Sequence, residues 1–204
     1  ENKDEIAFYA FMQQQYEKQW KALQDYAHER EIRILGDIPI YCAMDSADVW
    51  GNRKMFDFSW KGRNIEEESA CDAEVKGYPG FVAGVPPDAF SETGQLWGNP
   101  LYDWEAQEKD NYAWWCRRME YCLNQFDLLR VDHFRGFEGY YAVPYAAKTA
   151  INGEWRKGPG LALFEAFQKY FNKKELPMIA EDLGVITEGV RDLIRAVGCP
   201  GMKV

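Results

Sequence analysis

Helical and strand patterns alternate along this chain, and each expected strand is short and almost entirely apolar. The first helix is expected over residues 5–30, with a strand in 32–41. Helical stripes in 112–126 and 161–171 are each followed by another apolar run of strand length. Strands without a polar face are typical of parallel sheets that helices cover. The order of elements therefore predicts an α/β fold.

An open doubly wound sheet and a closed eight-stranded barrel both satisfy this alternation. No G-x-G-x-x-G follows an expected strand, which removes the main reason to expect a dinucleotide-binding fold. Polar residues instead stand at the C-terminal ends of three successive strands, where a (β/α)8 (TIM) barrel carries its active site. These residues are Asp37, Arg130, Asp132, Glu181 and Asp182. We therefore expect part of a (β/α)8 barrel.

A long stretch with little periodicity, 42–105, separates the first expected strand from the second helix. Loops of that length in compact domains tend to be functional or disordered, and the aromatic content here argues against disorder. Within it, 84–100 combines prolines, glycines and aromatic residues. We expect 42–105 to be an ordered insertion and 84–100 to be an active-site lid. A further helix is expected after Thr187, a capping residue, up to Gly198.

Composition narrows the class of ligand. A net charge of -9 argues against nucleic acid or an anionic membrane as partner, because such binding needs clustered Lys and Arg. A neutral or small ligand is therefore expected, and an aromatic content of 16% is an excess that needs an explanation. Five cysteines without a C-x-x-C pair indicate reduced thiols and a cytoplasmic protein, and two histidines argue against a zinc site. We therefore expect no bound metal. Neither a membrane span nor a secretion signal is recognisable.

Arg130 and Asp132 place opposite charges in one apolar strand. Alternate residues of a strand point to the same side, so both side chains should face away from the packed Leu129 and Val131. An opposite charge within about 4 to 6 Å lowers the pKa of a carboxyl group by about 1 to 3 units, which would keep Asp132 ionised and able to act as a nucleophile. A structural salt bridge at a strand end fits the same pattern equally well.

Glu181 ends the next expected strand. Neighbouring parallel strands lie about 4.8 Å apart, so its carboxyl group should come within about 5 to 5.5 Å of that of Asp132, as in retaining glycosidases. Such a pair needs one charged and one protonated group, and Arg130 supplies the asymmetry. Taken alone, Glu181 also fits a solvated strand end. His133 could bind a sugar hydroxyl or cap the backbone.

Sugars have flat C–H faces and many hydroxyl groups, so their sites need aromatic platforms with hydrogen-bonding side chains around them. The expected lid has both kinds of residue, namely Phe90 and Trp97 with Asp88, Gln95 and Asn99. A surface tryptophan packs on its own loop more often than on a ligand, so the lid taken alone gives only a modest preference for sugar binding.

Four stretches resemble the 4-α-glucanotransferases known as amylomaltases or disproportionating enzymes, glycoside hydrolase family 77. In order, they are GDIPIY with DSADVW, GVPPDAFSETGQLWGNPLYDW, LLRVDHFRGFEGYY and IAEDLG. The resemblance runs over nearly all of residues 1–204, and the wider α-amylase clan shares these strand ends. It implies that the chain is part of a catalytic (β/α)8 barrel domain and contributes about the third to fifth of eight strands.

The resemblance also implies roles for individual residues. Asp132 would be the nucleophile and Glu181 the general acid/base. The implied substrate-binding residues are Arg130, His133, Asp37, Asp88, Gln95, Trp97 and Asp182. A third carboxylate of the family has no counterpart in this sequence and is expected beyond residue 204.

The implied activity is transfer of a segment of an α-1,4-glucan to the 4-hydroxyl group of another glucan or glucose. Malto-oligosaccharides would be donor and acceptor, without a cofactor. An α-glucan hydrolase of the same clan and a non-catalytic glucan-binding fragment are the alternatives. The sequence starts without methionine and stops where a strand should begin, so we expect a fragment of a longer protein that has no turnover by itself.

Overall fold

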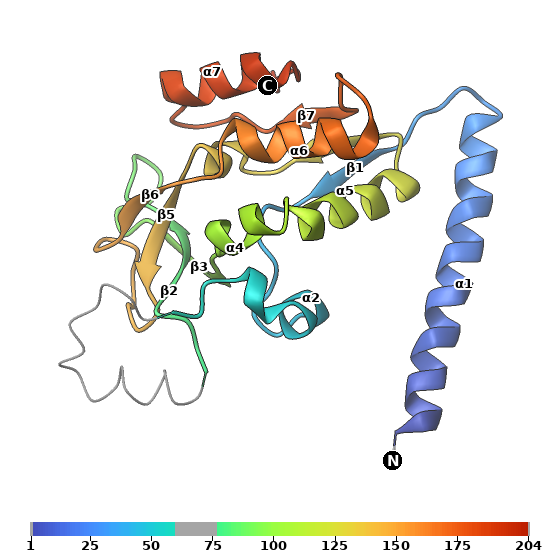
Figure 1. Ribbon diagram of the computed structural model, residues 1–204, viewed down its shortest axis with the longest axis horizontal. Helices are drawn as coiled ribbons and strands as arrows, with labels where there is room; N and C mark the ends of the chain where they lie inside the picture. The colour runs from blue at the N-terminus through green and yellow to red at the C-terminus, as the bar shows by residue number, and fades with distance from the viewer. Residues whose placement is uncertain (1, 60–76, 204) are drawn as a thin grey trace.

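The computed structural model describes residues 2–59 and 77–203, which form two sheets with helices around them (Figure 1). The first sheet is parallel and has the order β1-β4-β7. Its strands are β1 (Leu35–Ile38), β4 (Leu128–Val131) and β7 (Met178–Ala180). The predicted α/β class, with parallel strands separated by helices, is confirmed.

Helices follow the strands as the periodicity predicts. Helix α5 (Ala113–Gln125) contacts β1 and β4, and α6 (Leu161–Phe171) lies between α5 and α7 (Glu188–Val197) (Figure 1). The Thr187 hydroxyl accepts a hydrogen bond from the backbone N–H of Val190 at the start of α7. A left-handed Gly198 (φ 74°) ends this helix, so both predicted caps are confirmed.

The main core lies between the parallel sheet and these helices. Alternate strand residues are buried, such as Ile38, Leu129 and Val131, and they meet a layer of aromatic side chains. Trp115 is fully buried in this layer, where its ring contacts Phe137 at 5.5 Å between ring centroids. Burial of large aromatic rings contributes much of the stability of a small core, so this layer holds the strands in place.

The opposite face of the parallel sheet is only partly covered by the described residues. Leu35 is 53% exposed, and Asp37, two residues later on the same side of β1, is also exposed. Arg130 is half-buried on the same side of the sheet. The expectation that the strands have no solvent-facing side therefore does not hold in the part of the chain that the structure describes, where helices cover one face.

A second, antiparallel sheet was not predicted. Its strands, in spatial order, are β3 (Gln95–Pro100), β2 (Phe81–Val85), β5 (Gly139–Pro144) and β6 (Glu154–Lys157). Strands β2 and β3 fall in the expected insertion, whose residues 60–76 lie outside the described chain. Prolines and glycines around these strands hide their periodicity, and their partner β5 is distant in sequence. The expected lid 84–100 is therefore mostly a β-hairpin.

Short helical elements connect the two sheets. They are α2 (Ala47–Gly51), η1 (Arg53–Met55), α4 (Trp104–Lys109) and η2 (Phe134–Phe137). The last of these follows directly on the end of β4 and leads into β5. It therefore links the strand that immediately precedes Asp132 to the antiparallel sheet.

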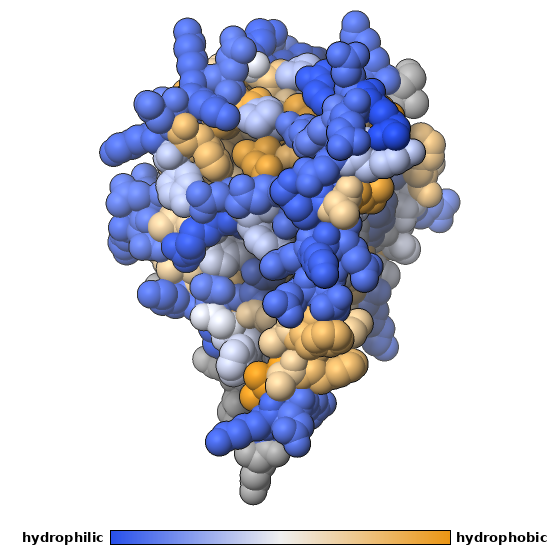
Figure 2. All heavy atoms as spheres, turned by 90° about the vertical axis from the view of Figure 1, so that its right-hand side faces the viewer, coloured by the Kyte–Doolittle hydropathy of each residue, from blue (hydrophilic) through white to orange (hydrophobic). Residues whose placement is uncertain are grey.

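The first helix, α1 (Lys3–His28), confirms the expected helix but extends away from the rest of the molecule (Figure 1). It is tied to α5 near its C-terminal half, where Trp20 Nε1 donates to the carbonyl of Gln125 at 2.8 Å. Apolar side chains gather on the N-terminal half of α1 (Figure 2), among them Ile6 and Phe8, which are 67% and 57% exposed. The stripe predicted the helix correctly, but the described residues do not bury it.

Four cysteines are free, as expected, and Cys71 lies outside the described residues. Of the helices in 2–59 and 77–203, none is both long and apolar enough to cross a membrane.

Trp115→Ala should lower the free energy of unfolding by about 3 to 5 kcal/mol, because it leaves a large cavity in the aromatic layer. Trp50→Ala is the matched control, since Trp50 is 87% exposed on α2 and its loss should change stability by less than about 0.5 kcal/mol. Urea unfolding followed by far-ultraviolet circular dichroism measures both. Equal effects of the two substitutions would contradict this assignment of the core.

Candidate active site

Arg130 joins the ends of two parallel strands. Its Nη1 lies 2.7 Å from Oδ1 of Asp37, its register partner on β1, and its Nη2 lies 2.6 Å from Oδ1 of Asp132. The hydrogen bond with Asp37 is the main cause that raises the pKa of the guanidinium group. The prediction that Arg130 and Asp132 share a face is therefore confirmed.

Glu181 lies beside the residues that follow β4. Its backbone N–H donates to the carbonyl of Val131 at 3.0 Å, which continues the parallel pairing of β4 with β7. Its carboxylate accepts two backbone hydrogen bonds, Oε2 from His133 at 2.9 Å and Oε1 from Leu183 at 2.8 Å. The carboxylate of Glu181 is thus bound to the residue that immediately follows Asp132.

His133 adopts a left-handed backbone conformation (φ 49°, ψ 49°), which is uncommon for a residue other than glycine and is enriched at functional sites. Its ring meets that of Trp97 edge to face at 4.8 Å between centroids. Burial, and secondarily the charge of Arg135, lower the pKa of His133 to about 4. The imidazole is therefore neutral at pH 7, with one nitrogen able to donate and one able to accept a hydrogen bond.

Two cavities open at this edge of the sheet, and Trp97 lines both. The smaller cavity, about 190 Å³, contains Asp132 and is called the nucleophile cavity after the role predicted for this residue. The larger, about 480 Å³, contains Glu181 and His133 and is called the acid/base cavity after the role predicted for Glu181. The two carboxylates therefore face neighbouring spaces that share one indole ring.

The wall of the nucleophile cavity is held by hydrogen bonds to the segment that follows β1. The carbonyl of Ile40 accepts from the Tyr102 hydroxyl at 2.7 Å and from Arg118 Nη1 at 3.2 Å. Asn99 Nδ2 on β3 donates to the carbonyl of Cys42 at 2.9 Å. These bonds connect the parallel sheet to the antiparallel sheet and keep Tyr41, a cavity residue, in place.

Three predicted binding residues of the hairpin, Asp88, Gln95 and Trp97, line the acid/base cavity. Oδ1 of Asp88 accepts from the backbone N–H groups of Phe90 and Ser91, so this side chain also shapes its own turn. Gln95 Oε1 accepts from Trp97 Nε1 at 3.0 Å. Gln95 thereby orients the indole ring that the two cavities share.

Asp182 lies apart from the other predicted residues. Its Oδ1 accepts from the backbone N–H of Met202 at 2.8 Å, and it lines neither of the two cavities. A Cβ atom at Gly201 would come within 2.3 Å of its Oδ2, so the chain after Cys199 packs directly on this carboxylate. In the described chain Asp182 organises that segment. Phe90 is 96% exposed and lines neither cavity.

Sequence reasoning missed Tyr41, Arg135 and Trp155 as cavity residues. Tyr41 carried a usable signal, because it closely follows the C-terminal end of an expected strand. Trp155 and Arg135 carried none, because their place in the cavity depends on η2 and on the pairing of β5 with β6.

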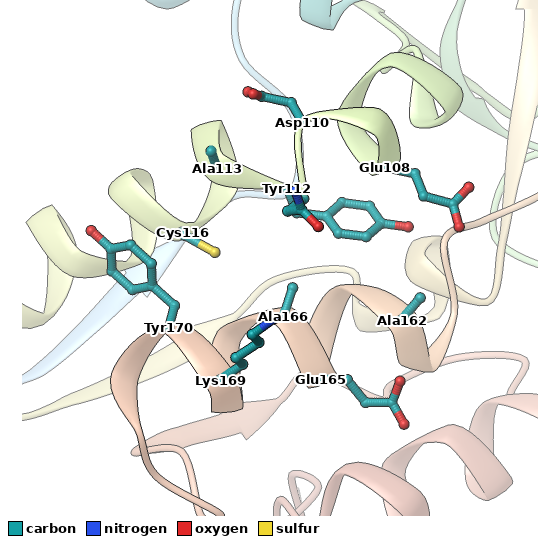
Figure 3. A pocket seen from close by; sticks show the side chains of 11 residues that line it. Glu108, Asp110, Tyr112, Ala113, Cys116, Ala162, Glu165, Ala166, Lys169 and Tyr170 are labelled. Carbon is teal, nitrogen blue, oxygen red and sulfur yellow. The ribbon is translucent and has the colours of Figure 1, made fainter.

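A larger cavity of about 740 Å³ lies between α4, α5 and α6 (Figure 3). It is lined by Tyr112 and Tyr170 together with acidic residues and Lys169. None of the predicted site residues lines it. Size alone is a poor guide here, so the candidate active site is the sheet edge that carries Asp132 and Glu181. No cluster of three or more potential metal ligands occurs within 2–59 and 77–203.

The neutral state of His133 predicts a pH-dependent stability. Between pH 6.5 and about 4, the unfolded chain binds a proton at His133 that the folded chain excludes, so the free energy of unfolding should fall as the pH is lowered. The full effect is about 3 kcal/mol. Urea unfolding across this range should show a shallower pH dependence in His133→Gln than in the unsubstituted protein or in the control Trp50→Ala, which changes an exposed side chain without a titratable group. Equal slopes in His133→Gln and the unsubstituted protein would contradict the assignment.

Comparison with known proteins gives a consistent result. The family model described as 4-alpha-glucanotransferase matches residues 1–204. The chain is 49% identical over 202 residues to a 4-alpha-glucanotransferase of Aquifex aeolicus, a match that covers 99% of this chain and 38% of that protein. It is 48% identical over 202 residues to a chloroplastic/amyloplastic 4-alpha-glucanotransferase of Solanum tuberosum, covering 99% of this chain and 32% of the relative. The chain therefore spans well under half the length of these relatives.

Solved structures resemble the fold. An amylomaltase from Streptococcus agalactiae in complex with acarbose matches with a TM-score of 0.79 and 38% identity, over 92% of this chain and 34% of that one. An amylomaltase from Corynebacterium glutamicum, 20% identical, matches with a TM-score of 0.76 over 98% of this chain and 26% of that one, which concerns the fold alone. With the family model covering the whole chain, this protein belongs to the 4-alpha-glucanotransferase family, glycoside hydrolase family 77.

Proposed function

We propose that this chain carries the nucleophile, Asp132, and the general acid/base, Glu181, of an enzyme that transfers segments of α-1,4-glucans. The proposal rests on the contact between the ends of β4 and β7, where the N–H of His133 binds Glu181 next to Asp132. Arg130 engages the charged form of Asp132, which is the form that attacks an anomeric carbon. Each oxygen of Glu181 accepts one backbone bond and keeps a lone pair that can hold a proton.

The reaction is a double displacement. Asp132 attacks the anomeric carbon of a glucosyl unit while Glu181 protonates the glycosidic oxygen, which leaves with the rest of the glucan. This gives a covalent glycosyl ester of inverted configuration. Glu181 then takes the proton of an acceptor 4-hydroxyl group, whose oxygen attacks the same carbon and restores the α configuration. A separation of about 5 to 5.5 Å between the two carboxyl groups suits this sequence of steps.

Transfer, rather than hydrolysis, requires that a sugar hydroxyl group outcompetes water at the ester. Binding and orienting the acceptor can lower the activation free energy of this step by about 7 to 11 kcal/mol in well-ordered systems. The hairpin within 84–100 brings Asp88, Gln95 and Trp97 to the acid/base cavity, where an acceptor must lie. We therefore propose that this hairpin, acting as the predicted lid, favours transfer over hydrolysis by binding the acceptor.

The chain provides part of a larger catalytic domain in this proposal. The parallel sheet β1-β4-β7 corresponds to about the third to fifth strands of a (β/α)8 barrel, with 42–105 as an insertion that carries the lid. The exposed inner face of the sheet supports this, because other strands of a closed barrel would cover it. The third carboxylate of the family would come from outside residues 1–204, so we expect no turnover from this segment alone.

Malto-oligosaccharides are the proposed donors and acceptors, and the reaction needs no cofactor. His133 and Gln95 offer hydrogen bonds to hydroxyl groups, while Trp97 offers an apolar face to a sugar ring. Nucleic acid and membranes remain unsuitable partners on the grounds of net charge. A cytoplasmic location stays a prediction that rests on the free cysteines.

The full-length protein that carries this segment should convert maltotriose into a ladder of longer malto-oligosaccharides together with glucose and maltose. Chromatography of the products distinguishes the alternatives, because glucose and maltose alone would identify a hydrolase. Unchanged maltotriose would favour a non-catalytic glucan-binding protein. The isolated 204-residue chain should produce no ladder, and measurable transfer by it would refute the proposed division of the site.

Asp132→Asn should lower kcat for transfer at least about a thousandfold, because the covalent ester can no longer form. Asp192→Asn is the control, since Asp192 is an exposed carboxylate on α7 paired with Arg195, and it should keep full activity. The azide-rescue test uses Asp132→Gly with maltosyl fluoride, and β-maltosyl azide is the expected product because azide then attacks in place of the carboxylate. Full transfer by Asp132→Asn would exclude its role as nucleophile.

A further inference from the structure

Trp155 lines the acid/base cavity but has no role in the reaction described above. It lies on β6, an outer strand of the antiparallel sheet, whereas Trp97 lies on β3, the outer strand on the other side. The side chain of Trp155 is 47% exposed, although neighbouring groups contact its ring. We propose that Trp155 is a stacking platform for a glucosyl unit of the acceptor, an inference that rests on the proposed transfer reaction.

The indole ring of Trp155 is held in place before any ligand binds. The ring of Tyr141, its register partner on β5, meets it edge to face at 5.3 Å between centroids. The guanidinium group of Arg135 lies over it, with Cζ 4.2 Å from the ring centroid. Arg135 is in turn anchored by Nη1, which donates to the carbonyl of Val185 at 2.7 Å. A platform that is already ordered loses little conformational entropy when a sugar stacks on it.

The Nε group of Arg135 makes no hydrogen bond to the described residues while the guanidinium group lies over the ring of Trp155. This Nε is buried, so the missing hydrogen bond is costly for a charged group. The flat guanidinium group stacks on the indole ring, and a lysine ammonium group has no equivalent planar surface. The geometry therefore makes Arg135 a positioning residue for Trp155.

The position of the two carboxylates assigns Trp155 to the acceptor side. In the proposed mechanism the anomeric carbon of the donor lies at Asp132, in the nucleophile cavity. The leaving-group oxygen, and later the acceptor hydroxyl group, must reach Glu181, in the acid/base cavity. A sugar ring in the cavity that contains Trp155 is therefore the leaving-group or acceptor sugar.

The chemistry of the ring suits such a sugar. A glucosyl unit has apolar C–H faces, and stacking removes both these faces and the exposed part of the indole from water. The cavity also contains Gln95 and neutral His133, which can bind the hydroxyl groups at the rim of the ring. Trp97 and Trp155 provide two platforms, so the cavity has aromatic surface for more than one contact with the acceptor chain.

The test uses the full-length protein with maltotriose as donor and labelled glucose as acceptor. Trp155→Ala should raise the KM for glucose about threefold to tenfold, as expected for a lost aromatic contact. The initial rate of fluoride release from α-maltosyl fluoride should stay within about twofold, because fluoride is a leaving group without a sugar ring and Asp132 and Glu181 are unchanged. Trp155→Phe should give an intermediate KM, and Trp50→Ala, which changes a tryptophan 87% exposed on α2, should leave it unaltered.

Equilibrium binding gives a readout that does not depend on turnover. Calorimetric titration of Glu181→Gln with maltose measures the affinity of the cavity, and adding Trp155→Ala should weaken it by the same factor as the KM. The inference is overturned when a protein that transfers normally shows the same acceptor KM in Trp155→Ala, Trp155→Phe and Trp50→Ala. Loss of maltose binding in Trp155→Ala from a parent protein without transfer activity would support the platform and refute the transferase proposal.

Discussion

The ion pairs of Arg130 connect the parts of the site that the fold brings to one edge. The guanidinium group bridges Asp37 at the end of β1 and Asp132 after β4, so it links neighbouring strands through side chains as well as through the backbone. Surface ion pairs contribute little to stability, and those of Arg130 are partly exposed. Their main effect is on geometry. The ion pair holds the carboxylate of Asp132 at the edge of the sheet, while backbone N–H groups hold the carboxylate of Glu181.

The antiparallel sheet adds aromatic side chains to the cavity at the end of the parallel sheet. Strand ends supply the two carboxylates of the proposed mechanism, and the aromatic platforms proposed for a sugar ring come from the other sheet. Strands β3 and β6 bring Trp97 and Trp155 to the same cavity as Glu181, and η2 connects this sheet to the end of β4. In the proposed function, chemistry and substrate recognition thus come from two different sheets, joined by the short segment that contains His133 and Arg135.

Much of the fold was predictable, because helix periodicity and apolar strands are local signals. The helix ending at Gly198 and the pairing of Arg130 with Asp132 depend on neighbours a few residues apart, and both predictions are confirmed. Strands β2, β3, β5 and β6 were missed, because the pairing of β2 with β5 joins distant segments and β2, β3 and β5 contain glycine or proline. The apolar stripe of α1 predicted its helix but not its exposed position.

The sequence by itself determined which chemistry is available: two carboxylates at successive strand ends, an arginine two residues before one of them, and aromatic residues nearby. Only the tertiary structure decided which of these groups share a space. Asp182 is next to Glu181 in the chain, yet it binds Met202, whereas Trp155 is distant in sequence and lines the cavity of Glu181. The physical reason is that neighbouring strand residues point to opposite faces, while sheet pairing unites residues that are far apart along the chain.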